Sequence, residues 1–183
     1  MNKYFITFLF LVSLFPSFTF AQCDSQYDVF FEMGLSDDWE DPNSQDCITE
    51  DVCLTRGGWG PLFNAAQGQE PGGGDYTYLT PLGTQWAIGP LDNLQTDFGN
   101  FVDVLDHDVG DELHDLILSE TPMTMYLVDY DQYIQVQFKD WAHGGQDYYY
   151  YYPTGHLGYS NFAYCRTSIP DCDDELACNY GEA

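Results

Sequence analysis

One short run of alternating residues constrains the fold of this chain more than any other feature. Over residues 133–139, apolar side chains alternate with polar ones, which is the period of a β-strand with one buried face. Residues 123–128 form a second apolar run, and the polar residues 129–132 lie between the two. Together they predict a β-hairpin with an acidic tip.

Shorter segments predict the rest of a mainly β domain. Residues 94–105 carry apolar side chains at helical spacing, and the period continues through 110–119, where Gly110 weakens it. One short helix is therefore expected at 94–105, and residues 110–119 are a second candidate helix. Other strands are expected at 47–56, 76–82, 84–88 and 160–166. The apolar residues 29–31 are expected in an extended arm or an edge strand. This combination predicts a β-sandwich or jelly-roll.

The first 21 residues have the pattern of a secretory signal peptide. Lys3 precedes an apolar run over residues 4–15, and small residues near Ala21 suit a cleavage site. No later stretch of the sequence is apolar for the length that a membrane helix needs. We expect the protein to be secreted or displayed at the cell surface, with no membrane span.

The six cysteines of a secreted chain of this size indicate a disulfide-stabilised fold. Six cysteines permit fifteen pairings, so the connectivity stays open. In the chain-entropy model, a pair that ties the two ends of the domain would stabilise it by roughly 4 to 5 kcal/mol. The spacing favours Cys47 with Cys53, Cys172 with Cys178, and Cys23 with Cys165.

Acidic residues dominate the charge of the chain. It has 30 Asp and Glu against four Lys and Arg, for a formal net charge of −26. Such a surface repels nucleic acid and anionic membranes and attracts cations. The simpler interpretation is a solvated, salt-adapted surface.

Calcium is the cofactor for which the sequence offers candidate ligands, because acidic loops of extracellular modules bind this ion. Neither of the two acidic runs has the spacing of an EF-hand, so solvated charge is the competing interpretation. The candidate calcium ligands are Asp171, Asp173, Asp174 and Glu175, and a second acidic run contains Asp103, Asp106, Asp108, Asp111 and Glu112.

No motif predicts an enzyme. The sequence has neither an HExxH zinc motif nor a GxSxG nucleophile elbow. We interpret its four histidines as surface or hydrogen-bonded residues: His107, His114, His143 and His156. With 30 acidic residues, the carboxylate pair of a glycosidase would arise by chance and indicates nothing.

Aromatic side chains are the candidate ligand-binding residues, because sugar rings or a protein partner can rest on their flat apolar faces. The competing interpretation places the tryptophans, and alternate rings of the tyrosine run, in the core. The candidates are Trp141, Tyr148, Tyr150 and Tyr152.

Three blocks resemble an uncharacterised secreted β-sandwich module of Bacteroidota-like bacteria. They are TEDVCLTRGGWGPLFN at 49–64, GTQWA at 83–87, and the FKDW, Gly-Gly and NFAYCR elements within 133–166. The similarity covers most of residues 47–168 and implies a β-sandwich there. Residues 147–159 look like an insertion, and Asn161 stands where the family tends to have glycine.

The segment DCDDELACNYGEA at 171–183 resembles the start of a C-T-D-x-x-A-C-N-Y repeat of secreted proteins from marine Bacteroidota. Such repeats imply a large, multi-module surface protein. The third cysteine of the unit would follow residue 183, so we expect a truncated chain, which leaves the pairing of Cys172 with Cys178 open. The expected organisation is a signal peptide at 1–21, an acidic arm at 22–46, the module at 47–168 and the repeat start at 169–183.

Three functions are compatible with these features. The first is a non-enzymatic module of a cell-surface or matrix protein, acting in adhesion, assembly or glycan contact, with calcium as a candidate stabiliser. The second is a carbohydrate-active enzyme or its binding module. The third is an extracellular filament subunit, in which the arm before Cys47 completes the sheet of a neighbour. The sequence leaves the oligomeric state open.

Overall fold

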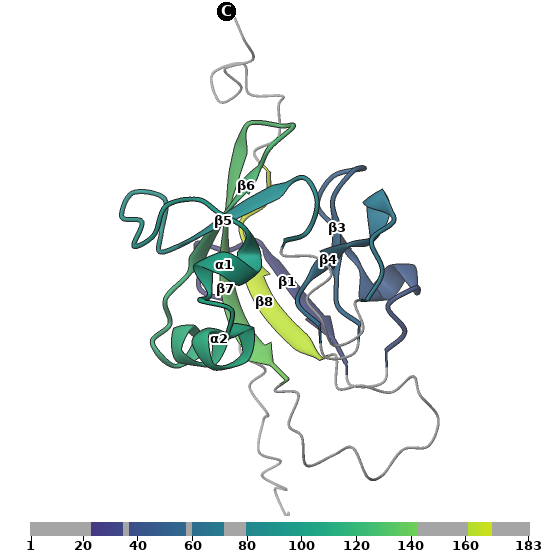
Figure 1. Cartoon of the computed structure of the whole chain (residues 1–183), viewed down its shortest axis with the longest axis horizontal. Helices are drawn as coiled ribbons and strands as arrows, with labels where there is room; N and C mark the ends of the chain where they lie inside the picture. Colours follow the sequence, from purple (N-terminus) through teal and green to yellow (C-terminus); the bar gives the residue numbers. More distant parts are fainter. Residues whose placement is uncertain (1–22, 35–36, 58–59, 72–79, 143–160, 170–183) are drawn as a thin grey trace, which may run out of the picture.

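The structure is a computed structural model, and it describes residues 23–34, 37–57, 60–71, 80–142 and 161–169 (Figure 1). Within them the fold is mainly β, with two antiparallel sheets. The larger sheet has five strands in the spatial order β1 (Val29–Met33), β8 (Phe162–Arg166), β7 (Gln132–Trp141), β6 (Met123–Leu127) and β5 (Thr84–Ile88). The smaller has three, in the order β2 (Asp46–Cys47), β3 (Cys53–Thr55) and β4 (Phe63–Asn64).

Helical segments are few and short in the described part of the chain. They are α1 (Phe101–Val104), α2 (Val109–Leu118) and the 3-10 turns η1 (Pro42–Ser44) and η2 (Ala65–Gln67). Only α2 is long enough to bury a side, and the predicted mainly β fold with one short helix is confirmed. Of the expected strand at 76–82, residues 76–79 lie outside the described part, and residues 80–82 form no strand.

The predicted hairpin is confirmed as β6 and β7, and it divides the larger sheet into two faces. The pairing sets Met125 opposite Ile134 and Tyr126 opposite Tyr133. Met125 and Ile134 are buried in the core, so neighbouring residues along each strand point away from it. We call the core side of the larger sheet its inner face and the opposite side its outer face.

The helices and the smaller sheet cover the inner face. In Figure 1, α1 and α2 lie at β7, to the left of β8, and β3 and β4 lie to the right of β8. Phe101 of α1 meets Trp86 of β5 edge to face, with 5.0 Å between ring centroids. Leu113 of α2 joins the same cluster. Burying each such side chain stabilises the fold by about 1.5 to 3 kcal/mol.

The helix expected at residues 94–105 is wrong over most of its length. Residues 95–99 instead run along the free edge of β5, where Gly99 and Trp86 exchange two backbone hydrogen bonds of 2.8 and 2.9 Å. Unpaired strand edges need such partners, and this need overrides a helical pattern of apolar residues. The longer helix lies at α2, whose first turn is capped by the Asp108 carboxylate accepting from the Asp111 backbone, which offsets Gly110.

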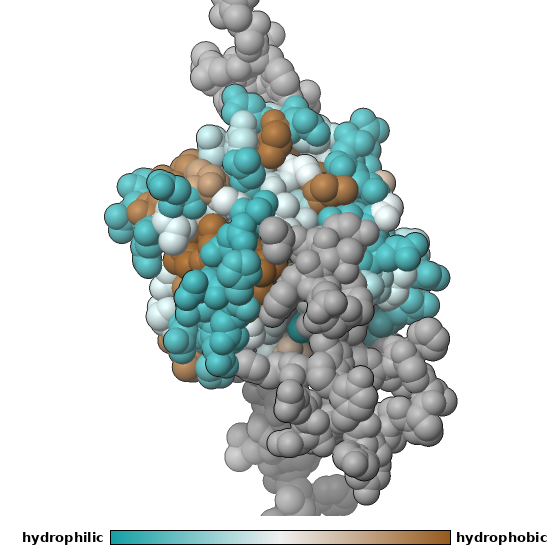
Figure 2. All heavy atoms as spheres, in the orientation of Figure 1, coloured by the Kyte–Doolittle hydropathy of each residue, from teal (hydrophilic) through white to brown (hydrophobic). Residues whose placement is uncertain are grey.

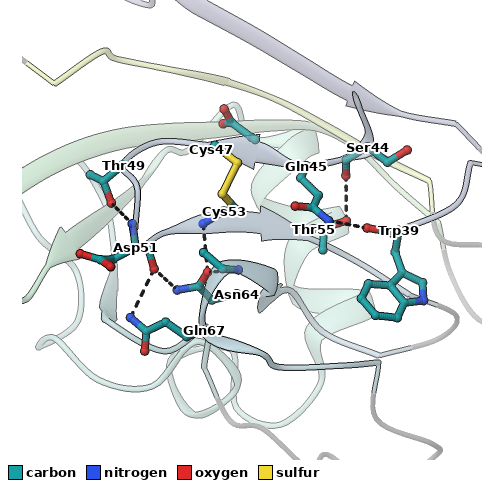
Figure 3. Close-up of a disulfide and its surroundings, with 12 residues drawn as sticks. Trp39, Ser44, Gln45, Cys47, Thr49, Asp51, Cys53, Thr55, Asn64 and Gln67 are labelled. Carbon is teal, nitrogen blue, oxygen red and sulfur yellow. Dashed lines mark hydrogen bonds between the residues drawn. A yellow bond between two sulfur atoms is a disulfide. The ribbon is translucent and has the colours of Figure 1, made fainter. Parts of the chain in front are cut away.

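The single strand expected at residues 47–56 is also wrong, because the chain reverses within it. β2 pairs antiparallel with β3, and Cys47 lies opposite Cys53 (Figure 3). The turn between them is closed by the Ile48 backbone N–H donating to the Val52 carbonyl at 2.8 Å. A continuous strand would separate the two cysteines by roughly 20 Å, whereas a disulfide needs Cα atoms within about 7 Å.

Two of the expected disulfides are present, Cys47 with Cys53 and Cys23 with Cys165. The third expected pair, Cys172 with Cys178, lies outside the described residues. Cys23 precedes β1 and Cys165 lies in β8, and these two strands are also neighbours in the sheet. The segment around residues 29–31 is thus an edge strand of the chain's own sheet.

A buried ion pair joins the two sheets. Arg166 of β8 donates from Nε and Nη2 to the two carboxylate oxygens of Asp46 in β2, at 2.6 and 2.8 Å. The Tyr164 hydroxyl donates to the same carboxylate at 2.7 Å. All three side chains are buried. Burial, followed by the charge of Asp46, raises the pKa of Tyr164 well above its ordinary value.

We predict that Asp46→Asn lowers the free energy of unfolding by about 3 to 5 kcal/mol, because it leaves the buried Arg166 without a counter-charge. Tyr164→Phe, which removes one hydrogen bond, lowers it by about 0.5 to 1.5 kcal/mol. Urea unfolding with the disulfides intact measures both. If the Asp46→Asn protein unfolds at the same urea concentration as the wild type, the ion pair does not hold the sheets together.

Candidate functional site

Three aromatic rings gather on the outer face of the larger sheet. Tyr126 and Tyr133 lie opposite each other on β6 and β7, and their rings stack with centroids 4.8 Å apart. The ring of Phe98 lies 5.7 Å from Tyr133 and 6.1 Å from Tyr126. Tyr133 is 42 % exposed. We call these three residues the aromatic surface.

The register of the sheet and the covered edge of β5 build this surface together. Direct cross-strand neighbours on one face are close enough for their rings to touch. Phe98 belongs to the segment that runs along β5, directly before the Gly99 bridge to Trp86. The departure from the expected helix is therefore what places the third ring.

The polar edge of the aromatic surface is fixed by Asp131. The Tyr126 hydroxyl donates to the Asp131 carboxylate at 3.1 Å. This hydrogen bond raises the pKa of Tyr126, with smaller contributions from burial and from the Asp131 charge. The hydroxyl therefore stays protonated at physiological pH, and the surface combines apolar ring faces with a held hydroxyl group.

A shallow pocket of about 540 Å³ lies on the same side of the sheet. Its lining includes Gln135, which lies two residues beyond Tyr133 on β7 and points to the same face. The lining residues are Gln26, Pro90, Leu91, Asp92, Pro122 and Gln135. The pocket and the aromatic surface are thus neighbours on the outer face.

A tight turn after β5 forms one wall of the pocket. Gly89 has φ +102°, and a Cβ atom at this position would come within 2.6 Å of the Asn93 carbonyl oxygen. Only glycine adopts this conformation readily. The Thr124 hydroxyl donates to the Gly89 carbonyl at 2.8 Å, which holds the turn against the outer face and sets Leu91 at the pocket.

Away from the outer face, Trp39 and Phe63 form another aromatic pair, edge to face with 5.4 Å between ring centroids, and Phe63 is buried. In Figure 2, the side that carries α1 and α2 is mainly hydrophilic, with separate hydrophobic patches. Leu118 of α2 is the most exposed large hydrophobic residue, at 70 %. Isolated apolar residues of this kind are ordinary on protein surfaces.

Trp141, a candidate ligand-binding residue from the sequence, lies in the core instead. It is 8 % exposed, and its ring contacts those of Phe101, Phe138 and Phe162. The Arg56 guanidinium covers one ring face, with its central carbon 3.8 Å from the ring centroid. Trp141 therefore presents no open face to a ligand.

Arg56 satisfies three backbone carbonyls that lie far apart in sequence. Its Nε, Nη1 and Nη2 donate to Gly60, Asn161 and Ala142 at 2.9, 3.1 and 3.0 Å. Burial lowers the pKa of Arg56 to about 9, and the charge of Asp140 partly opposes this. The guanidinium thus holds β3, β7 and β8 together at one end of the domain.

We predict that Arg56→Lys lowers the free energy of unfolding by about 1 to 3 kcal/mol. A lysine keeps the positive charge, but its single ammonium cannot reach three divergent carbonyls and leaves buried acceptors unpaired. Calorimetry of both proteins measures the difference. Lys139→Arg, at a partly exposed position, is the control and leaves stability unchanged. An equal melting temperature for the position 56 variant would contradict this role.

The remaining sequence candidates fall outside the described residues or remain untested by them. Tyr148, Tyr150 and Tyr152 lie outside, as do the candidate calcium ligands Asp171, Asp173, Asp174 and Glu175. Within the described ranges, no group of three His, Cys, Asp or Glu side chains could hold a metal ion. The acidic run at residues 103–112 therefore forms no such group, although His107 Nε2 lies 3.3 Å from an Asp103 carboxylate oxygen.

Comparison with protein-family models, curated proteins and solved structures finds no match for the chain. The resemblance to a secreted bacterial module stays a prediction. The helices of the described part are all too short or too polar to cross a membrane.

Proposed function

We propose that this protein is a secreted, non-enzymatic module of a cell-surface or extracellular-matrix protein, and that it acts in adhesion by contacting glycans. The aromatic surface is the observation that carries the proposal. It lies on a rigid sheet and exposes the ring of Tyr133, while Tyr126 and Phe98 support that ring from the side. The aromatic surface lies on the face opposite the core, so a ligand can bind there without disturbing the packing of the core.

The chemistry of the three rings suits carbohydrate. Tyrosine offers a large, rigid and amphipathic contact area that loses little conformational entropy on binding. The apolar side of a sugar ring packs on such a face, and its hydroxyl groups find polar partners at the edge. Here the polar edge is the Tyr126 hydroxyl, which Asp131 orients.

Two other functions receive less support. A carbohydrate-active enzyme requires two carboxylates at catalytic separation across a cleft, whereas the aromatic surface consists of three rings. A filament subunit of the expected kind would donate its N-terminal arm to a neighbour. The strand in that arm, β1, is already paired with β8 of its own chain.

We predict that Tyr133→Ala weakens binding to a neutral polysaccharide by roughly two- to tenfold, the loss expected from removing a stacked ring. Tyr133→Phe keeps the ring and retains binding. Leu118→Ala, an exposed apolar truncation on α2, is the matched control and binds as the wild type does. Affinity electrophoresis in gels containing xylan, mannan, a β-glucan or soluble cellulose derivatives measures these effects.

Absence of retention on every polysaccharide, or equal retention of Tyr133→Ala and the wild type, would contradict the proposal. Release of reducing sugar during the assay would point instead to the enzyme.

A further inference from the structure

We infer that the pocket beside the aromatic surface binds a second part of the same glycan, and that this glycan is a neutral chain of several sugar units. The inference rests on the proposed function, since it assigns a ligand class and an orientation to that site. Four observations support it. The two sites lie along one strand, and the side-chain amide of Gln135 has no hydrogen bond in the described part of the chain. The pocket has apolar walls and amide groups, and the surface charge is acidic.

The two sites lie along one strand. Tyr133 and Gln135 point to the same face of β7 and are separated by roughly 7 Å along the strand. Tyr133 contributes the exposed ring, and Gln135 lines the pocket. A single sugar on the tyrosine would leave the pocket empty, whereas an extended chain reaches both.

Gln135 is held in place by its backbone and not by its side chain. Its N–H donates to the Thr167 hydroxyl at 3.1 Å, and its carbonyl accepts from the Thr167 N–H at 3.0 Å. In the described part of the chain, no hydrogen bond engages its side-chain amide. The strand thus presents an amide whose donor and acceptor are both available to a ligand.

The lining of the pocket suits hydroxyl groups attached to an apolar ring. Pro90, Leu91 and Pro122 supply apolar walls. The Gln135 amide can donate to one oxygen and accept from another, and the Gln26 side chain, which interacts with the Tyr27 hydroxyl, adds a second amide to the lining. Vicinal hydroxyls on a sugar present this combination of acceptor and donor.

The charge of the protein restricts the ligand to neutral chains. Both arginines are buried, so Lys139 is the one lysine or arginine at the surface of the described residues, in a chain of formal net charge −26. Asp92 lines the pocket and Asp131 borders the aromatic surface. Uronic-acid or sulfated chains would meet like charge at both ends of the site.

A basic peptide is the competing occupant, because the acidic surface would attract it. The pocket favours the glycan, since its polar lining has two amides and one carboxylate. Basic side chains gain most from paired carboxylates, whereas neutral hydroxyl groups gain from amides.

The test is a titration of the full secreted chain by calorimetry with neutral oligosaccharides, namely the xylose, glucose and mannose series from two to six units. For the wild type, affinity rises with chain length. Gln135→Ala and Leu91→Ala each lose two- to tenfold of the affinity for the hexasaccharide, as expected for one lost hydrogen bond or apolar contact, and bind the disaccharide unchanged. Tyr133→Ala weakens both, and Leu118→Ala weakens neither.

Each other outcome overturns a defined statement. If the hexasaccharide binds the two pocket variants as tightly as the wild type, the pocket is not part of the site, although the proposed function stands. Equal binding of an oligogalacturonate overturns the restriction to neutral chains. An oligolysine peptide that binds the wild type and loses affinity in Gln135→Ala assigns the pocket to a protein partner. If no sugar binds the wild type, the proposed function itself fails.

Discussion

The fold depends most on the buried contact of Asp46 with Arg166 and Tyr164. It is a charged link between the two sheets, and it joins residues that lie 120 positions apart in the chain. A buried ion pair is costly to desolvate, and it forms only when its geometry is good. The larger sheet therefore cannot settle in another register against the smaller one without leaving a charge unpaired in the core. This link fixes which side of β8 faces inward, and hence which side of the larger sheet is free for a ligand.

The second arginine has a related role. Arg56 is held by three carbonyls and by the ring of Trp141, and the charge of Asp140 partly opposes the effect of burial on its pKa. Placing both arginines inside the protein leaves an acidic surface with little positive charge to balance it. The two arginines that hold the core together are buried, so their positive charges do not offset the acidic residues at the surface. Such a surface repels anionic ligands, which is consistent with the neutral ligand that we propose.

Sequence patterns predicted the elements whose stability is local. The alternation over residues 133–139 identified β7 and the hairpin correctly, because one face of that strand is buried along its length. The expectation for residues 47–56 failed although its contradiction was visible: a disulfide between Cys47 and Cys53 excludes a continuous strand. The helix expected at 94–105 failed for a reason outside the segment, since the free edge of β5 recruited residues 95–99. Apolar spacing alone carries no information on such an edge.

The candidate site was harder to foresee than the fold. Tyr126 and Tyr133 alternate with core residues, so their place on the outer face follows from the predicted hairpin once its register is known. Phe98 could not be placed while its segment was read as helix. The pocket is lined by residues from three separate segments: the turn after β5, strand β7, and the segment at Gln26. The last of these follows Cys23, which forms a disulfide with Cys165. Such long-range proximity has no signature in composition or period.

If the outer face of the larger sheet is the binding face, a nuclear magnetic resonance titration will locate the ligand there. Backbone amide signals of the isotope-labelled protein would be followed while a neutral hexasaccharide is added. We expect the shifted signals to cluster at Phe98, Tyr126, Tyr133 and Gln135, with α2 unaffected. Shifts confined to α2 or to the β2–β3 turn, or no shifts with any of the sugar series, would contradict it.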